Sequence, residues 1–172
     1  MNKFRMLSIL ATLATVLGLA SLNPAAILAG GPVVHHVSAG GPDICSAFGL
    51  KPGCDANFSL TANQYADGSV KGEYTDNWRV GTEKGDGLHV VINCVSVVGN
   101  EAWITGVVTK GTLNGLDLTG LPVGTRLRDN GTSANDPADD EISINFIGDP
   151  TPCTDHPDYP MFAMPQGQVV VK

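Results

Sequence analysis

Alternation of apolar and polar residues is the feature of this sequence that most constrains its fold. In residues 57–63 the side chains of Phe58, Leu60 and Ala62 fall on one face of an extended segment, and the residues between them are polar. A period of two residues is typical of a β-strand with one buried face. The Asp-Gly step at 67–68 favours a tight turn, because glycine adopts positive φ angles without strain. The pattern therefore predicts a β-hairpin.

Similar segments recur along the rest of the chain. Residues 89–98 form the longest candidate strand and are rich in β-branched side chains. Further candidate strands are residues 33–37, 70–74, 102–109, 125–128, 141–147 and 168–172. About eight strands without an amphipathic helix predict an all-β fold, either an antiparallel β-barrel or a β-sandwich. Residues 111–124 and 148–166 are expected to be long loops, and the strand glycines Gly72 and Gly106 to mark bends or bulges.

Residues 1–29 have the layout of a secretory signal peptide. The basic residues Lys3 and Arg5 precede an apolar stretch at 7–20, and small residues follow up to Ala29. The apolar stretch is shorter than the roughly 20 residues that a spanning helix needs, which favours a cleaved signal over a membrane anchor. We therefore expect cleavage after Ala29, a secreted protein in an extracellular or periplasmic location, and no membrane span after cleavage.

The rest of the chain is long enough for one hydrophobic core. We expect a single domain in which an N-terminal strand and disulfide loop (30–56) join a barrel or sandwich (57–172). The whole chain has 17 acidic and 10 basic side chains and a net charge of −7; residues 30–172 keep 8 basic against 17 acidic groups, a net charge of −9. Such an acidic chain is poorly suited to phosphate backbones, so nucleic acid is disfavoured as a partner.

Four cysteines follow the predicted signal peptide: Cys45, Cys54, Cys94 and Cys153. An even number in an exported chain predicts two disulfides, for which three pairings exist. We favour Cys45–Cys54 together with Cys94–Cys153, because the first pair brackets a compact loop rich in Gly and Pro. Zinc is disfavoured, since the short Cys-x₂₋₄-Cys spacing of zinc sites is absent.

A series of motifs runs through residues 40–172. They are Gly40-Gly41, the run 58–74, the run 94–106, the Asp-Asn-Gly step at 129–131, the acidic stretch through Asp140 and the terminal valine strand. Together they resemble a family of small exported bacterial β-domains. Its members occur alone or appended to larger surface proteins, and the family has no assigned activity. The resemblance implies a fold and a location, and it carries over no catalytic residue; the Cys45–Cys54 loop and Cys153 depart from the family's pattern.

Residues 129–141 form an acidic segment. Its aspartates are Asp129, Asp136, Asp139 and Asp140. Carboxylates on a loop are the hard oxygen ligands that Ca²⁺ prefers, and exported proteins meet millimolar Ca²⁺. The segment does not fit the EF-hand pattern, because Gly131 stands where the second ligand belongs. Calcium is therefore a hypothesis, and the competing interpretation is a solvated turn between two strands.

The sequence contains none of the common catalytic motifs. It has no Gly-x-Ser-x-Gly elbow, His-Glu-x-x-His pair, phosphate-binding loop or dinucleotide glycine pattern. A carboxylate pair for glycoside hydrolysis need not be close in sequence, but we expect Glu73 and Glu101 to be outward-facing surface charges. The adjacent His35 and His36 would point to opposite faces of a strand and are poorly placed to bind one metal.

Three aromatic side chains, those of Tyr74, Trp78 and Trp103, are candidates for stacking on a sugar or an apolar ligand. Aromatic residues on strands more often pack in a core, which is the prediction for Trp103. Trp78 lies among polar residues, in the run Asp-Asn-Trp-Arg, and is the better candidate for an exposed contact. Tyr74 and Trp78 are therefore the predicted ligand-contact residues.

These observations lead to three functional hypotheses. The first is a secreted, non-catalytic β-domain that acts in extracellular binding, adhesion or surface structure, with a partner outside the cell. The second is a small barrel that binds an apolar ligand, and the third is a hydrolase or isomerase on the same barrel. The barrel interior separates them: a filled core favours the first. An open cavity near Phe58, Tyr74 and Phe146 favours the second, and converging histidines or carboxylates favour the third.

Overall fold

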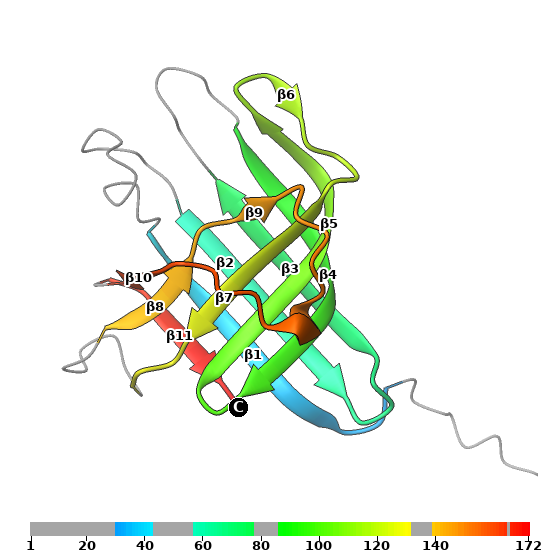
Figure 1. Cartoon of the computed structure of the whole chain (residues 1–172), viewed down its shortest axis with the longest axis vertical. Coiled ribbons are helices and arrows are strands. Elements are labelled where there is room, and N and C mark those ends of the chain that lie inside the picture. The colour runs from blue at the N-terminus through cyan, green and yellow to red at the C-terminus, as the bar shows by residue number, and fades with distance from the viewer. Residues whose placement is uncertain (1–29, 43–56, 78–85, 132–138, 165) are drawn as a thin grey trace, which may run out of the picture.

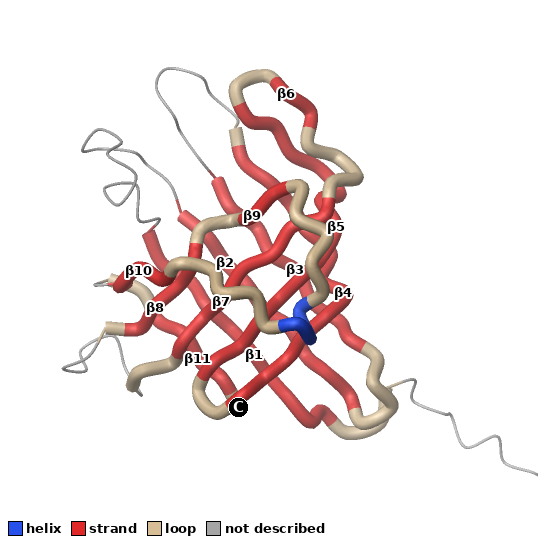
Figure 2. Tube along the Cα trace, viewed as in Figure 1, coloured by secondary structure: helices blue, strands red, loops and turns tan. Residues whose placement is uncertain are grey.

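The computed structural model describes residues 30–42, 57–77, 86–131, 139–164 and 166–172. They form a nearly closed antiparallel β-barrel (Figures 1 and 2). Nine strands follow one another around the sheet in the order β10-β8-β7-β5-β4-β3-β2-β1-β11. The predicted all-β fold is therefore confirmed, and of the two predicted architectures the barrel is the observed one.

The strands are β1 (Val33–Pro42), β2 (Asn57–Tyr65), β3 (Val70–Asn77), β4 (Gly87–Val98), β5 (Glu101–Leu113), β6 (Leu116–Asp117), β7 (Pro122–Arg128), β8 (Asp140–Ser143), β9 (Phe146–Ile147), β10 (Met161–Met164) and β11 (Gln168–Val171). The short β6 pairs with β5, and β9 pairs with β7, beside the main strand order. A 3₁₀ turn, η2 (Cys153–Asp155), lies between β9 and β10. Each strand predicted from alternation is found, usually extended by several residues, except that the predicted strand at 141–147 is divided into β8 and β9.

Two predicted loops contain strands. Residues 111–124 hold the end of β5, all of β6 and the start of β7, so that β5 and not the predicted segment is the longest strand. The turn between β5 and β6 uses positive φ angles at Asn114 (51°) and Gly115 (76°), the geometry of a two-residue hairpin. Residues 148–166 contain β10, whose Met-Phe-Ala-Met sequence lacks alternation and is flanked by prolines.

One predicted strand, at residues 141–147, is two strands in the structure. β8 pairs with β7 and β10, and β9 pairs with β7 at a different position. Between them the chain leaves the sheet, and the side chain of Asn145 donates a hydrogen bond to Asp76 on β3. The regular alternation of polar and apolar residues over 141–146 gave no sign of this bend.

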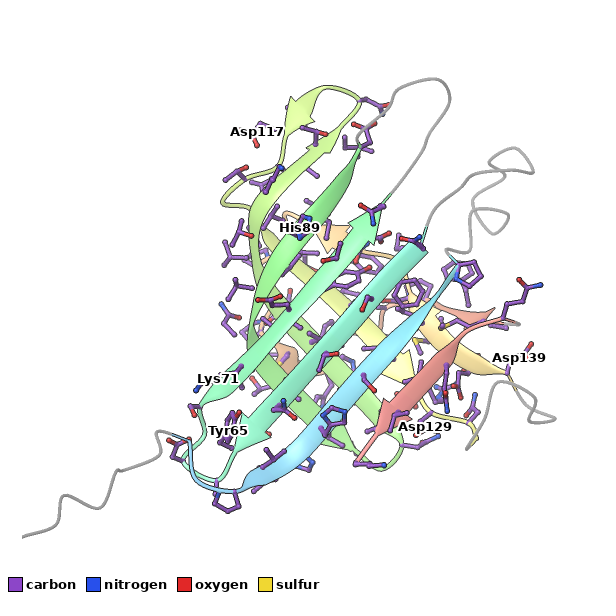
Figure 3. All side chains as sticks on the ribbon, turned by 180° about the vertical axis from the view of Figure 1, so that it is seen from behind. Tyr65, Lys71, His89, Asp117, Asp129 and Asp139 are labelled. Atoms are coloured by element: carbon purple, nitrogen blue, oxygen red, sulfur yellow. A yellow bond between two sulfur atoms is a disulfide. The ribbon has the colours of Figure 1, made fainter. Side chains whose placement is uncertain are left out.

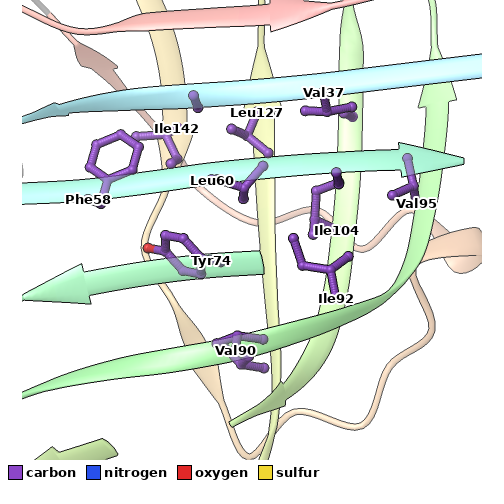
Figure 4. Packing of buried hydrophobic residues seen from close by; sticks show 14 of the residues in the cluster. Val37, Phe58, Leu60, Tyr74, Val90, Ile92, Val95, Ile104, Leu127 and Ile142 are labelled. Carbon is purple, nitrogen blue, oxygen red and sulfur yellow. The ribbon is translucent and has the colours of Figure 1, made fainter. Parts of the chain in front are cut away.

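Apolar side chains from all around the sheet fill the barrel. Figure 4 shows Val37, Leu60, Ile92, Ile104 and Leu127 pointing into one shared space, and each is at most 3% exposed. Neighbouring strands approach closely there. The same alternation that buries these residues leaves the polar residues between them on the outside of the barrel.

Gly106 on β5 is required by this close approach. A Cβ atom at this position would lie 2.5 Å from Val90 Cγ1 and 2.5 Å from the Val91 carbonyl oxygen. The β4–β5 register shifts twice near this glycine. The extra residue is Thr109 on β5 at the first shift and Asn93 on β4 at the second, which directly follows the Ile92–Gly106 pair. Gly106 therefore marks a point where two strands pack more tightly than any side chain allows.

The described part of the interior leaves little free space. A cavity lined mainly by apolar side chains, including Tyr74, Ile92, Ile104 and Val123, has a volume of about 10 Å³ for the centre of a water-sized molecule. That is about the volume that one water molecule requires. Around this cavity the described residues form a core of buried apolar side chains.

Side chains, not a backbone ladder, close the barrel beside β11. On one side β11 pairs with β1. On the other side the N–H groups of Val169 and Val171 donate to Asp140 Oδ2 (2.6 Å) and Asp129 Oδ2 (3.0 Å). We call this line of carboxylate–amide hydrogen bonds the seam.

Candidate functional site

Two of the aspartates predicted to bind calcium hold the seam together. Asp129 Oδ1 accepts a hydrogen bond from the Gly131 N–H (3.2 Å), and Asp140 Oδ1 accepts one from the Asn130 N–H (2.8 Å). With the bonds from β11, all four carboxylate oxygens of Asp129 and Asp140 accept backbone N–H groups. Both side chains therefore have a structural role, which sequence reasoning did not anticipate.

The other two predicted calcium ligands are not brought into this arrangement. Asp139 lies next to the seam, on the same side of the barrel as Asp129 (Figure 3), and Asp136 is outside the described residues. Within the ranges that the structure describes, no group of three or more His, Cys, Asp or Glu side chains is placed to hold a metal ion. Calcium binding by this segment stays an untested hypothesis.

The predicted ligand-contact residue Tyr74 points into the barrel. It is 4% exposed, and its ring packs edge-on against Phe58 with 6.4 Å between ring centroids. Its hydroxyl donates to Asp76 Oδ2 (2.8 Å), which also accepts the Asn145 side-chain amide (2.6 Å). Because β3 and the end of β8 lie across the barrel from each other, this network ties opposite walls together. Trp78, the other predicted contact, is outside the described residues.

The densest set of side-chain contacts on the outside of the barrel lies under residues 148–160, which we call the strap. The strap leaves β9, crosses the outer face of β4, β5 and β7, and returns to β10 (Figure 1). A disulfide joins Cys94 on β4 to Cys153 in the strap, with 6.0 Å between the two Cα atoms. This confirms the predicted Cys94–Cys153 pair; the predicted Cys45–Cys54 pair lies outside the described residues.

Trp103 is buried, as predicted, but outside the barrel and beneath the strap. Its neighbours Ala102 and Ile104 face the barrel core, so its own side chain faces outward, and the strap leaves it only 7% exposed. The indole Nε1–H donates to the Pro157 carbonyl oxygen in the strap (3.0 Å). The His156 ring lies 4.4 Å from the indole ring, between ring centroids.

Arg126 lies beside Trp103 and links it to a network of charges. Its guanidinium carbon is 5.1 Å from the centroid of the indole ring, within cation–π range. Arg126 forms ion pairs with Glu101 (2.6 Å) and with Asp158 of the strap (2.9 Å). Arg128 forms ion pairs with Glu101 (2.8 Å) and Glu141.

Glu101 is the centre of this network. Its side chain faces outward, as predicted, but it is only 18% exposed. Desolvation raises the pKa of Glu101, and the hydrogen bonds and positive charges of Arg126 and Arg128 outweigh it, so that the pKa is lowered overall. The same interactions with Glu101 raise the pKa of Arg128. The predicted surface charge is thus part of a half-buried ion-pair network.

A second aromatic pair holds the other part of the strap. Tyr159 stacks on Phe146 with ring centroids 3.9 Å apart and an interplanar angle of 10°. Its hydroxyl donates to Asp149 Oδ2 (2.9 Å), and burial together with this carboxylate raises the pKa of Tyr159. Hydrogen bonds from Thr151, and then the one from Tyr159, lower the pKa of Asp149. The ring lies over Gly124 on β7, where a Cβ atom would be 2.6 Å from the Tyr159 hydroxyl.

Three of the described histidines have polar partners of their own, at separate places on the barrel. His36 is bonded to Asn63 and His89 to Thr75, on different strands of the barrel wall. His156 Nε2 is 2.8 Å from Ser96 Oγ. Among the described residues no carboxylate is hydrogen-bonded to the His156 ring, so this pair lacks the third group of a serine-hydrolase triad.

Comparison with known proteins adds no relative: no family model matches the chain, and no curated protein or solved structure is significantly similar to it. The described residues also contain no helix with the length and apolar character to span a membrane.

Proposed function

We propose that this protein is a secreted, non-catalytic β-domain that acts in extracellular binding, adhesion or surface structure, and that it belongs with the small exported bacterial β-domains whose motifs it shares. The packed interior is the observation that carries the proposal. A barrel that carries an apolar ligand needs a cavity of several hundred Å³. The cavity found among the described core residues offers space for about one water molecule. A partner is therefore met on the outside of the barrel.

The outer wall formed by β2, β3 and the exposed parts of β4 and β5 offers a broad polar surface for such contacts. Figure 3 shows this wall, with His89 and Lys71 on neighbouring strands. Its exposed side chains, eight of which are polar or charged, are Ser59, Thr61, Lys71, Glu73, Asn77, His89, Val91, Asn93, Val107 and Thr109. Hydroxyl and amide groups presented on a rigid sheet are able to form many hydrogen bonds at low entropic cost.

The disulfide and the predicted signal peptide support an extracellular setting. Disulfides persist in oxidising compartments and are rare in the reducing cytosol. The Cys94–Cys153 bond is fully enclosed on its strap side, since Cys153 is buried. The proposal thus combines an exported chain, a barrel stapled on its outer face and a core without room for a ligand.

Binding to the producing cells tests the proposal. The purified protein is labelled with a fluorophore and titrated onto intact cells and onto their isolated extracellular polymer, with unlabelled protein as competitor. We expect saturable binding that the unlabelled protein displaces, and recovery of the native protein from the medium or periplasm. A protein that stays in the cytoplasm, or binds neither preparation saturably, would overturn the proposal.

A further inference from the structure

The strap and the barrel are two separate packing units. The β4–β5 and β5–β7 ladders run without any contribution from the strap. The apolar cluster inside the barrel does not include Trp103, Cys153 or Tyr159, although all three are buried. These three side chains instead form a small second core between the strap and the outer face of the sheet.

The strap contacts the sheet in the way that a bound peptide would. His156 offers a ring to the Trp103 indole, Pro157 offers a carbonyl oxygen to its Nε1–H, and Asp158 offers a carboxylate to Arg126. The strap thus supplies a ring, a hydrogen-bond acceptor and a carboxylate. These contact the indole ring and Nε1–H of Trp103 on β5 and the guanidinium of Arg126 on β7. Trp and Arg are also the residue types that most often dominate the energetics of protein interfaces.

We propose that the outer face of β4, β5 and β7 around Trp103 and Arg126 is a recognition surface for an acidic peptide segment that carries a ring beside its carboxylate. The strap occupies this surface in the oxidised protein, and cleavage of the Cys94–Cys153 disulfide makes it available. The inference rests on the proposed extracellular binding function and names a surface and a partner chemistry for it.

The disulfide is the covalent tie that keeps the strap in place. A dithiol reductant supplies two electrons and two protons: the Sγ–Sγ bond breaks, Cys94 and Cys153 become thiols, and the dithiol closes to its own disulfide. The remaining contacts of the strap are then noncovalent. Among them the Arg126–Asp158 pair contributes selectivity for an acidic segment more than affinity, because the Asp158 side chain is fully exposed.

Tryptophan fluorescence measures whether the surface opens. In a Trp78→Phe background, Trp103 is the only tryptophan of the chain, so quenching by acrylamide reports on its exposure alone. We expect the double variant Cys94→Ser, Cys153→Ser to show several-fold stronger quenching, with an unchanged β-sheet circular dichroism spectrum. The matched control is Cys45→Ser, Cys54→Ser, for which we expect the quenching of the parent protein.

A peptide supplied in trans tests the recognition. The peptide spans residues 152–160 with serine in place of cysteine at 153, and it is titrated into the Cys94→Ser, Cys153→Ser protein. We expect it to restore the protection of Trp103. A His156→Ala version of the peptide should bind about thirtyfold more weakly, since it loses the ring contact with Trp103 and the hydrogen bond with Ser96.

Three results would overturn the inference. If the double variant keeps Trp103 protected, the strap does not depend on the disulfide; if the variant loses its β-sheet spectrum, strap and barrel are not separable. If Trp103 becomes exposed and the peptide does not protect it, the surface is not a recognition site. The proposed extracellular function is tested independently of these results, because cell binding is measured on the oxidised protein without peptide.

Discussion

Replacing Asp140 by asparagine removes one of the two carboxylates that close the barrel. Asp140 Oδ2 accepts the Val169 N–H at 2.6 Å, and Oδ1 accepts the Asn130 N–H at 2.8 Å. Asparagine keeps the shape of the side chain but has only one acceptor oxygen. In the Asp140→Asn variant one of the two backbone N–H groups therefore faces an NH₂ group and has no acceptor.

The expected loss of stability follows from these contacts. A hydrogen bond to a charged group is worth about 1.5–3 kcal/mol, and a buried donor left without a partner costs about 1–3 kcal/mol. Val169 is fully buried, so water does not replace the lost acceptor. We expect the free energy of unfolding to fall by roughly 2–4 kcal/mol, a large part of the roughly 5–15 kcal/mol that is typical of a domain.

Urea unfolding followed by circular dichroism measures this loss, and Asp139→Asn is the matched control. It makes the same change of charge at the neighbouring residue, which is exposed, and should alter stability by less than about 0.5 kcal/mol. Hydrogen exchange of the Val169 amide should also become faster in Asp140→Asn. Equal losses in both variants would refute the reasoning, because the effect would then come from net charge and not from the seam.

Three further predictions concern the outer face and the acidic segment. Glu101→Gln should lower the free energy of unfolding at pH 7 by about 1–3 kcal/mol. Because the folded-state pKa of Glu101 is lowered, its contribution is present above the unfolded-state pKa and disappears as the pH falls through the folded-state pKa. Urea unfolding should therefore show a smaller difference from wild type at pH 3 than at pH 7, with Glu73→Gln at an exposed residue as the control. Gly124→Ala should lower the free energy of unfolding by about 1–3 kcal/mol, because its Cβ atom would meet the Tyr159 ring. Thermal unfolding measures this loss, and Gly40→Ala, whose Cβ atom would have no contact closer than 3.5 Å, should have little effect. Millimolar Ca²⁺ should leave the Tm unchanged, because the carboxylate oxygens of Asp129 and Asp140 already accept N–H groups; a rise in Tm that a chelator reverses would instead establish a calcium site.

Local patterns were sufficient to predict most of the barrel wall. The alternation of Phe58, Leu60 and Ala62 with polar residues is a direct consequence of one buried and one solvated face, so it appears in the sequence. β10 could not be found in this way, because a short strand between prolines shows no periodicity. The bend after β8 was missed for a different reason: Asn145, which lies in the bend, contacts Asp76, a residue 69 positions away in sequence.

The contacts that define the candidate sites were less accessible to sequence reasoning. Trp103 was correctly expected to be buried, but its cover is formed by the strap, which only the tertiary fold brings to β5. One signal for the position of the strap was available, because a Cys94–Cys153 disulfide requires the residues near Cys153 to pack against the strand that contains Cys94. The seam had no such signal: Asp129 and Asp140 read as solvated turn residues, and only the closure of the barrel places them against β11.

Native mass spectrometry of the protein purified from its producing cells tests the central claim most directly. If the barrel is filled and the partner binds outside, the folded protein carries no small molecule, and its native mass equals the mass of the polypeptide with its disulfides. A stoichiometric additional mass that is lost on unfolding would contradict the account, because it would show that the barrel interior holds a ligand.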